Sequence, residues 1–293
     1  MTALAHADSP GFVSALLHRL SVWRTILTIS VAERLVYRGD FMLGTLMRFL
    51  PIVTQIFLWT AVFAGQGGIK LGGYSKDDII AYYLLTMVAR AFSSMPGHAG
   101  AIARSIRDGS VKKFLTQPVD WLEFLFLTRV AHKLVYYAVA LLPFALVFYL
   151  CRDYFPPLPD AGTWLAFLAS LAMSFLLGFY MEAAIGMIGF WFLEVSSLLF
   201  VYMLFNFFLS GHMFPLTLLD GVDLFAGVNL GDVVRALPFQ YLAYFPAAVF
   251  LGKVEGPELT QGLLMELAWV VGFIVLSRVW YARGIKRYAA FGG

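Results

Sequence analysis

The stretch FLFLTRVAHKLVYYAVALLPFALVFYL (Phe124–Leu150) decides the class of fold. From Leu134 onward it contains no charged residue. About 20 consecutive apolar residues in an α-helix span the roughly 30 Å hydrocarbon core of a bilayer, so this stretch is predicted to cross a membrane. Arg129 and Lys133 lie near its start, where long basic side chains can extend to the membrane surface.

Five further apolar stretches complete a predicted bundle of six transmembrane helices. The composition agrees, since 60% of the 293 residues are apolar and 13% are charged, whereas a soluble domain carries about 25% charged residues. The second stretch is the weakest because it contains Arg90, and the fourth is longer than one perpendicular crossing requires. The chain is thus predicted to be an all-α integral membrane protein, with its other spans at Phe41–Ala64, Asp78–Met95, Thr163–Leu193, Val195–Phe214 and Leu263–Tyr281.

The basic residues predict the orientation of these spans. With the N-terminus inside, the segments between spans place twelve Lys and Arg residues on the inner side and five on the outer side. Cytoplasmic loops of membrane proteins are enriched in Lys and Arg. Both termini are therefore predicted to be cytoplasmic, which fits an even number of spans.

Residues 1–40 are predicted to form a cytoplasmic or interfacial segment, and residues 41–293 a single transmembrane domain. Between Phe12 and about Val36, apolar residues recur every three or four positions, a spacing that is typical of an amphipathic helix lying in the membrane interface. This helix is either a plain anchor or also a brace for a cytoplasmic partner.

The segment AIARSIRDGSVKKFLTQPVD (Ala101–Asp120) is the predicted cytoplasmic loop between spans two and three. It is expected to be helical on both sides of Gly109 and to end at Pro118, which cannot continue a helix. Ile102 and Ile106 share one face, whereas Val111, Phe114 and Leu115 form another. An apolar ridge on a charged surface suits docking into a groove on another protein, and an ordinary solvated loop is the alternative.

The predicted outer segment Pro215–Gln261 is too apolar for a free loop. Its part LPFQYLAYFPAAVFLG (Leu237–Gly252) is shorter than a full crossing and contains Pro238 and Pro246. Irregular backbone at membrane depth is tolerated where protein or a water-filled cavity covers it. We therefore expect a re-entrant segment that dips into the membrane from outside, or one that lies on its surface.

The sequence contains little that indicates an enzyme. No G-x-x-x-x-G-K-[ST] phosphate-binding loop occurs, so the chain is not expected to hydrolyse ATP. Neither a metal site nor a bound cofactor is expected, because the histidines lie at separate boundaries and H-E-x-x-H is absent. Ser210 and His212 are two residues apart at a predicted helix end, a poor spacing for a nucleophile and its base.

Polar residues inside the predicted spans are costly in lipid and should face the bundle or an interface. Glu182 is either a proton site or a helix cap near the inner surface. Asn206 is surrounded in sequence by aromatic residues, and its amide is expected to face a second subunit or water. This stripe is either packing or a pathway for a flat, apolar or cationic solute, and its candidate residues are Tyr202, Phe205, Asn206 and Phe208.

Four segments together resemble the permease subunits of type-2 ABC exporters, and more closely a bacterial branch of six-span permeases that are often encoded as unlike pairs beside one ATPase gene. Each motif alone is loose, but their order and placement cover nearly the whole chain after residue 30. His212–Met213 departs from the small or aliphatic residues that are frequent there. The segments are IRDGSVKKFLTQPV (Ile106–Val119), FLSGHMFPLTLL (Phe208–Leu219), LPFQYLAYFPAAVFLG (Leu237–Gly252) and the basic end RGIKRYAAFGG (Arg283–Gly293).

This resemblance implies a permease of the bacterial inner membrane that exports a small amphipathic or hydrophobic compound. It implies a second permease subunit, identical or unlike, and nucleotide-binding ATPase subunits that hold the ATP and Mg²⁺; no nucleic acid is involved. The outer gate would comprise His212, Met213 and Phe214. Coupling to the ATPase would fall to Ile106, Arg107, Asp108, Gly109, Phe114, Leu115 and Pro118.

Two other classes of function remain open from the sequence. One is a proton-coupled secondary transporter with Glu182 as its proton site. The other is a membrane scaffold that transports nothing, which needs neither a pathway nor a docking segment.

The topology is tested with single cysteines in a Cys151→Ser background, treated in intact cells with a membrane-impermeant thiol reagent. Cysteines replacing Lys70, Arg152 or Lys253 are expected to react, because these positions are predicted to lie outside. Cysteines replacing Lys113 or Lys286 should react only after the membrane is permeabilised. Labelling of position 113 from outside would overturn the topology.

Overall fold

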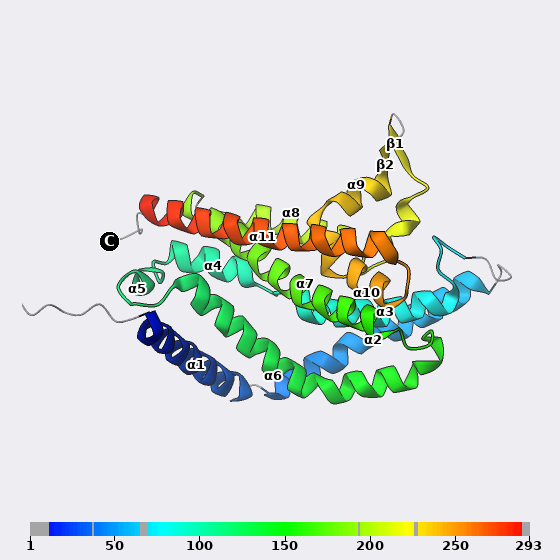
Figure 1. Cartoon of the computed structure of the whole chain (residues 1–293), viewed down its shortest axis with the longest axis horizontal. Coiled ribbons are helices and arrows are strands. Elements are labelled where there is room, and N and C mark those ends of the chain that lie inside the picture. Colours follow the sequence, from blue (N-terminus) through cyan, green and yellow to red (C-terminus); the bar gives the residue numbers. More distant parts are fainter. Residues whose placement is uncertain (1–11, 37, 65–69, 193, 226–227, 289–293) are drawn as a thin grey trace, which may run out of the picture. The chain divides into compact units, whose positions relative to one another are not determined.

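A computed structural model describes residues 12–36, 38–64, 70–192, 194–225 and 228–288 (Figure 1). Leu193, at the end of the predicted fourth span, and 289–293, in the basic end, lie outside the described residues. The chain forms two compact units, one of residues 1–47 with 114–144 and the other of residues 48–113 with 145–293. The predicted division between residues 40 and 41 stays a prediction.

The smaller unit contains α1 (Phe12–Val36) and most of α6 (Trp121–Leu150). The predicted N-terminal helix is therefore present, but its amphipathic character is weak over its full length. The reason lies in its second half, where the exposed apolar residues Ile29, Leu35 and Val36 fall outside the apolar stripe of the first half.

The larger unit contains the remaining helices and one short hairpin. Three helices cross the unit boundaries, namely α2 (Arg38–Phe63), α5 (Lys112–Leu115) and the end of α6. The hairpin, β1 (Asp223–Phe225) with β2 (Val228–Asn229), is antiparallel, an addition to the all-α fold expected from the sequence. The other elements are α3 (Lys76–Ser93), α4 (His98–Arg107), η1 (Arg152–Tyr154), α7 (Ala161–Met187), η2 (Ile188–Phe190), α8 (Ser196–Leu209), η3 (Leu216–Leu219), α9 (Leu230–Ala236), η4 (Pro238–Leu242), α10 (Tyr244–Phe250) and α11 (Gly256–Arg287).

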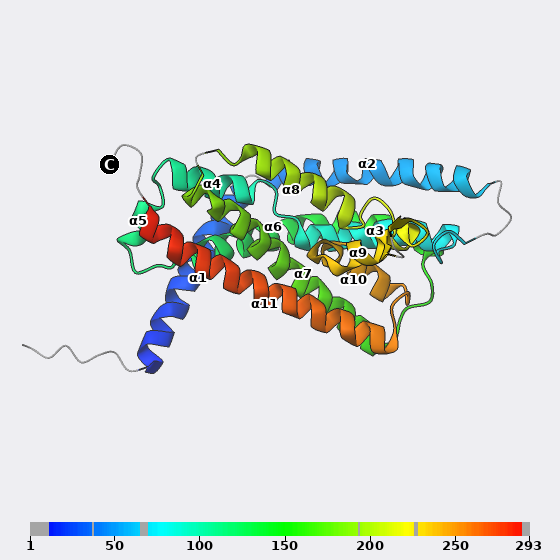
Figure 2. The ribbon, with the colours of Figure 1, turned by 90° about the horizontal axis from the view of Figure 1, so that it is seen from above.

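Helix α7 is the centre of the larger unit, with α3, α4, α10 and α11 packed against it (Figures 1 and 2). Glycines allow the closest of these approaches. A β-carbon at Gly178 would overlap the backbone carbonyl of Ser93 in α3, and one at Gly186 would overlap Ile102 in α4. The contact at Gly178 is with the backbone of α3, and the contact at Gly186 is with the Ala99 carbonyl and the Ile102 side chain of α4.

The short helix α10 is buried along its whole length. It packs against α3 and α7, and the Phe250 ring lies edge-on to Trp164 and Phe167 of α7 at centroid distances of 5.0 and 5.1 Å. The preceding turn η4 is tied to the end of α3 by the Ser93 hydroxyl, which donates to the Leu242 carbonyl at 2.7 Å. Within the segment that the sequence indicated as too apolar for a loop, η4 and α10 are thus part of the core.

Helices occupy all six stretches that the sequence indicated. Among the described residues, four helical stretches are long and apolar enough to cross a membrane, and two apolar helices are shorter, at Leu50–Phe63 and Ser196–Leu209. The predicted span Val195–Phe214 is too long, because α8 ends at Leu209. The chain turns there at Gly211, whose φ of 78° strongly favours glycine.

Gly178→Ala tests the contact between α3 and α7. The added methyl group meets a backbone oxygen, so we expect a loss of roughly 1–3 kcal/mol of stability, seen as a lower melting temperature of the purified protein. Gly272→Ala in α11 is the matched control, since nothing lies within 4 Å of its β-carbon position. It should leave stability unchanged or raise it by up to about 1 kcal/mol. Equal melting temperatures for the two variants would contradict this account of the packing.

Candidate functional sites

The predicted docking segment is built around a turn between α4 and α5. Gly109 adopts a φ of 83°, which ends α4 and reverses the chain. Asp108 accepts a hydrogen bond from the backbone N–H of Ser110 at 3.0 Å, and the Val111 N–H donates to the Ser105 carbonyl at 3.3 Å. The bonds from the Ser110 backbone and hydroxyl keep the pKa of Asp108 below its usual range, so this exposed carboxylate is charged at neutral pH.

The apolar residues of this segment divide between buried and exposed positions. Ile106 is buried in the α4 face that packs on α7, and Val111, five residues later, is fully buried as well. Arg107 lies 3.7 Å from Glu194, an ion pair between exposed side chains. In α5, Leu115 is 44% exposed. Helix α5 ends at this residue, three positions before Pro118, so the expected helix stop at the proline is wrong.

Phe114 is engaged within its own chain. Its ring lies 4.9 Å from that of Phe124 and 6.3 Å from that of Trp121, both in the first turn of α6. Asp120 caps this turn by accepting the Glu123 N–H at 2.8 Å. Leu115 is consequently the exposed apolar side chain of α5, whereas Phe114 secures the segment to α6.

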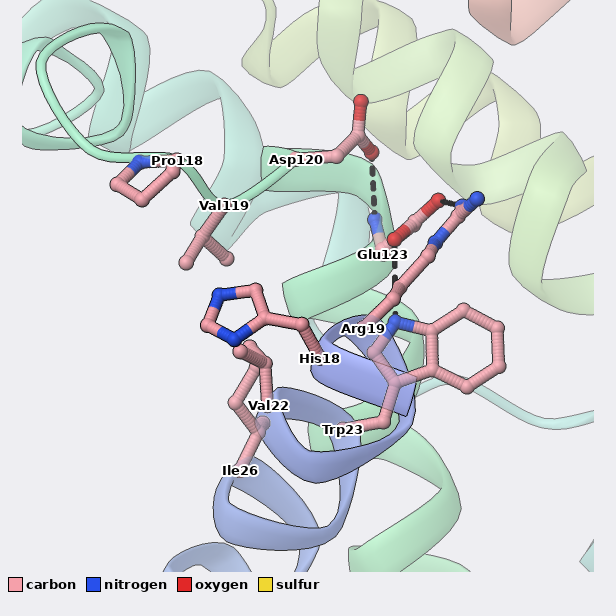
Figure 3. A pocket seen from close by; sticks show the side chains of 9 residues that line it. All are labelled: His18, Arg19, Val22, Trp23, Ile26, Pro118, Val119, Asp120 and Glu123. Atoms are coloured by element: carbon pink, nitrogen blue, oxygen red, sulfur yellow. Dashed lines mark hydrogen bonds and ion pairs between the residues drawn. The ribbon is translucent and has the colours of Figure 1, made fainter. Parts of the chain in front are cut away.

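A pocket of about 300 Å³ lies between α1 and the start of α6, next to Pro118 (Figure 3). Glu123 joins the two helices, because Arg19 forms an ion pair with its carboxylate and the Trp23 Nε1–H donates to it at 3.2 Å. His18 and Asp120 complete its polar rim (Figure 3). A surface with both signs of charge and an apolar floor suits a protein side chain better than a single ion.

The Glu182 side chain occupies the position of a helix cap, one of the two roles considered for it. Its carboxylate accepts a hydrogen bond from the Ala99 N–H at 3.2 Å, in the first turn of α4, where backbone N–H groups have no partner within the helix. Gly97, the residue before the first residue of α4, has a φ of 69° and supplies no side-chain cap. Helix α7 continues past Glu182 to Met187.

Asn206 has hydrogen-bond partners within the chain, and the expectation that its amide faces a second subunit or water stays a prediction. Its side-chain carbonyl accepts a hydrogen bond from the Arg90 guanidinium at 2.8 Å, and its amide N–H donates to the Tyr202 hydroxyl at 3.4 Å. The Tyr202 ring lies 6.2 Å from that of Phe239 in η4. By contrast, Phe205 and Phe208 of the predicted pathway are about half exposed.

The predicted outer gate is held by two tyrosines that the sequence analysis missed. The Tyr82 hydroxyl donates to the Gly211 carbonyl, and the Tyr83 hydroxyl donates to that of Met213. Tyr82 also lies 3.5 Å from the Phe214 carbonyl. Because the acceptors are backbone atoms, only the tyrosines, adjacent in an apolar helix, carried a signal in the sequence.

Ser210 and His212 are closer than their spacing suggested. The Ser210 hydroxyl and His212 Nδ1 are 2.9 Å apart, so the expectation of a poor geometry is wrong. Ser210 is nevertheless fully buried, and the N–H of Tyr244 is bonded to its carbonyl at 3.0 Å. A nucleophile needs access to its substrate, so this pair serves to close the turn after α8.

A second missed residue is Glu266 in α11. Its carboxyl group is fully buried and lies 2.8 Å from the hydroxyl of Ser170, which is also fully buried. The sequence did contain a signal, since Glu266 is an acidic residue within a predicted span, where ionisable groups are costly.

The described architecture is that of a helical membrane protein with a tight turn between α4 and α5 and short buried helices before its last long helix. A comparison with protein families identifies the family: residues 49–292 match the family described as ABC-2 family transporter protein. The chain therefore belongs to the ABC-2 transporter family and is a permease component of an ABC transporter. No curated protein matches the chain.

Asn206→Ala tests the polar contact between α3 and α8. It removes the acceptor of the Arg90 guanidinium inside the bundle, so we expect a loss of about 1.5–3 kcal/mol, the usual contribution of a hydrogen bond to a charged group. Thermal unfolding of the purified protein measures the effect. Met203→Ala on the same helix is the control, because this side chain is exposed and its removal should change stability by less than about 0.5 kcal/mol. An unchanged melting temperature for the Asn206 variant would show that the contact contributes nothing.

Proposed function

We propose that this chain is one of two permease subunits of an ATP-driven exporter for small amphipathic or hydrophobic molecules. The family match over residues 49–292 is the observation that carries the proposal. In this assignment the chain binds no cofactor, and ATP and Mg²⁺ are bound by separate ATPase subunits.

The docking segment supports association with such a subunit. Its turn is fixed by backbone hydrogen bonds around Gly109, and Arg107, Asp108 and Leu115 are exposed beside it. An exposed leucine among charged side chains is the pattern of a small contact surface whose centre is apolar. In this proposal Leu115 enters a groove of the ATPase subunit, while the buried side chains of Ile106 and Val111 hold the turn in place.

The transport pathway is proposed to lie at the interface of two permease subunits, lined in part by α8. No residue of α8 is fully buried within the chain. Its 14 residues give a length of roughly 21 Å, which is shorter than the hydrocarbon core. A crossing at this position would therefore also include the residues that flank the helix. Phe205 and Phe208 would face the solute, whereas Asn206 and Tyr202 hold the helix to α3 and η4.

The membrane arrangement belongs to the same proposal. Six crossings with both termini in the cytoplasm would place α2, α3, α6, α7, α8 and α11 across the inner membrane. The buried pair η4 and α10 would then be a re-entrant segment that enters from outside, where α3, α7 and α11 cover its backbone as lipid depth requires. His212, Met213 and Phe214 would form the outer gate beside it.

A secondary transporter that uses Glu182 is not preferred. Glu182 accepts the Ala99 N–H and so caps α4, next to the docking segment. A cap of this kind serves the position of α4 and does not need to exchange a proton.

Purification from native membranes, followed by mass spectrometry of the associated proteins, tests the proposal. A P-loop ATPase is expected to copurify. Leu115→Asp should reduce the amount of ATPase recovered by about tenfold or more, since losing one buried leucine contact costs about 1.5–3 kcal/mol.

Leu158→Asp is the matched control, because Leu158 is 80% exposed and is predicted to lie on the outer side. It should copurify the ATPase at the parent level. Absence of any ATPase from the parent preparation would contradict the proposed function. Equal recovery with Leu115→Asp and Leu158→Asp would instead remove only α5 from the contact.

A further inference from the structure

The interior of the larger unit contains a carboxyl group that none of the proposed transport steps uses. Glu266 of α11 faces α7, the helix beside it (Figure 2). One of its oxygens, Oε2, bonds to the Ser170 hydroxyl at 2.8 Å. The other oxygen, Oε1, is buried and has no hydrogen-bond partner in the described structure.

The groups that face this carboxyl are all uncharged. From η4, Tyr241 interacts with it electrostatically, and from α7 it meets Ser170. On α11 itself, Trp269 follows one turn later, and its Nε1–H is likewise buried without a partner. Among the described residues, no basic side chain interacts with Glu266.

A carboxylate in this position would be poorly stabilised. One hydroxyl group supplies one hydrogen bond, whereas a buried charge requires an opposite charge or several donors. A neutral carboxylic acid avoids most of that cost, because it accepts the Ser170 hydroxyl at one oxygen and holds its proton on the other. The neighbouring aromatic residues make the site more apolar still.

The short outer helices close the site on one side. Gly262, one turn before Glu266, has no side chain, and a β-carbon there would overlap the ring of Phe245 in α10. The Phe245 ring of α10 therefore lies directly against α11, one turn before the carboxyl, and η4 contributes Tyr241. Water can reach Glu266 from this side only if η4 and α10 separate from α11.

We propose that Glu266 is a proton-binding site that holds its proton while the junction of α7, α11 and η4 is closed, and releases it to water when η4 and α10 move away. A group that is protonated in the closed state and ionises in the open state links the two equilibria. Acid pH favours the closed junction, and rising pH favours opening. The site consists of this chain's residues alone and does not depend on the proposed exporter function.

Infrared difference spectroscopy of the purified full chain in a detergent without ester groups tests the protonation directly. A glutamic acid in water is almost fully ionised at about pH 7. We expect the parent protein to retain the C=O band of a protonated carboxylic acid at that pH, and Glu266→Gln to lose it. Glu182→Gln is the matched control and should keep the band, because Glu182 is a cap that accepts a backbone N–H.

Ser170→Ala keeps the test decisive if the glutamine variant does not fold. It removes the partner of the carboxyl, so the band should persist at a shifted frequency. A parent spectrum without the band, or a band that survives in Glu266→Gln, overturns the proposal.

The link to opening is tested by amide hydrogen exchange of residues 237–252. The ratio of the parent rate to the Glu266→Gln rate at each pH removes the chemical pH dependence of exchange. We expect this ratio to rise with pH, because only the parent can ionise and open. A ratio that stays constant from acid to alkaline pH would refute the link.

Discussion

Inside a membrane bundle, each polar group must find its partner within the protein, because lipid offers none. Helix α7 meets this requirement for much of the larger unit. Its Glu182 caps α4, its Ser170 bonds to Glu266 of α11, and its Tyr180 carbonyl accepts the Ser277 hydroxyl at 2.9 Å. The polar bonds of α7 thus fix the rotation of both neighbouring helices, which apolar packing alone leaves less well defined.

The same helix determines how closely its neighbours approach. Small residues at helix contacts in membranes bring backbones together and raise the number of van der Waals contacts. Gly178 admits α3, and Gly186 admits α4. Glu182 reaches the first turn of α4 because this approach is close, so the polar cap depends on the glycine contact and the two features support one site.

Apolar runs predicted the helices well, because a bilayer demands long continuous stretches. They predicted the ends poorly, as with α8, which stops at Leu209, since an end depends on a turn such as that at Gly211. The turn between α4 and α5 was predicted from Gly109. The hydrogen-bond partners of Asn206 could not be predicted, because Arg90 lies more than a hundred residues away in the chain and no local sequence pattern indicates such a contact. Backbone acceptors, as used by Tyr82, leave no trace in the sequence at all.

The two ends of α7 contact different elements, which has a mechanical consequence. Near its C-terminal end it packs against α4, which leads into the turn at Gly109. Near its N-terminal end it contacts α10 through Phe167 and Phe250. Packed interiors are dense and poorly compressible, so a displacement of α4 cannot be absorbed locally at the Gly186 contact. It must shift α7 or slide along it. A shift of α7 reaches α10 and η4, which pack against it near Glu266, so α4 and the end of the larger unit that holds α10 are joined by one continuous set of packed contacts.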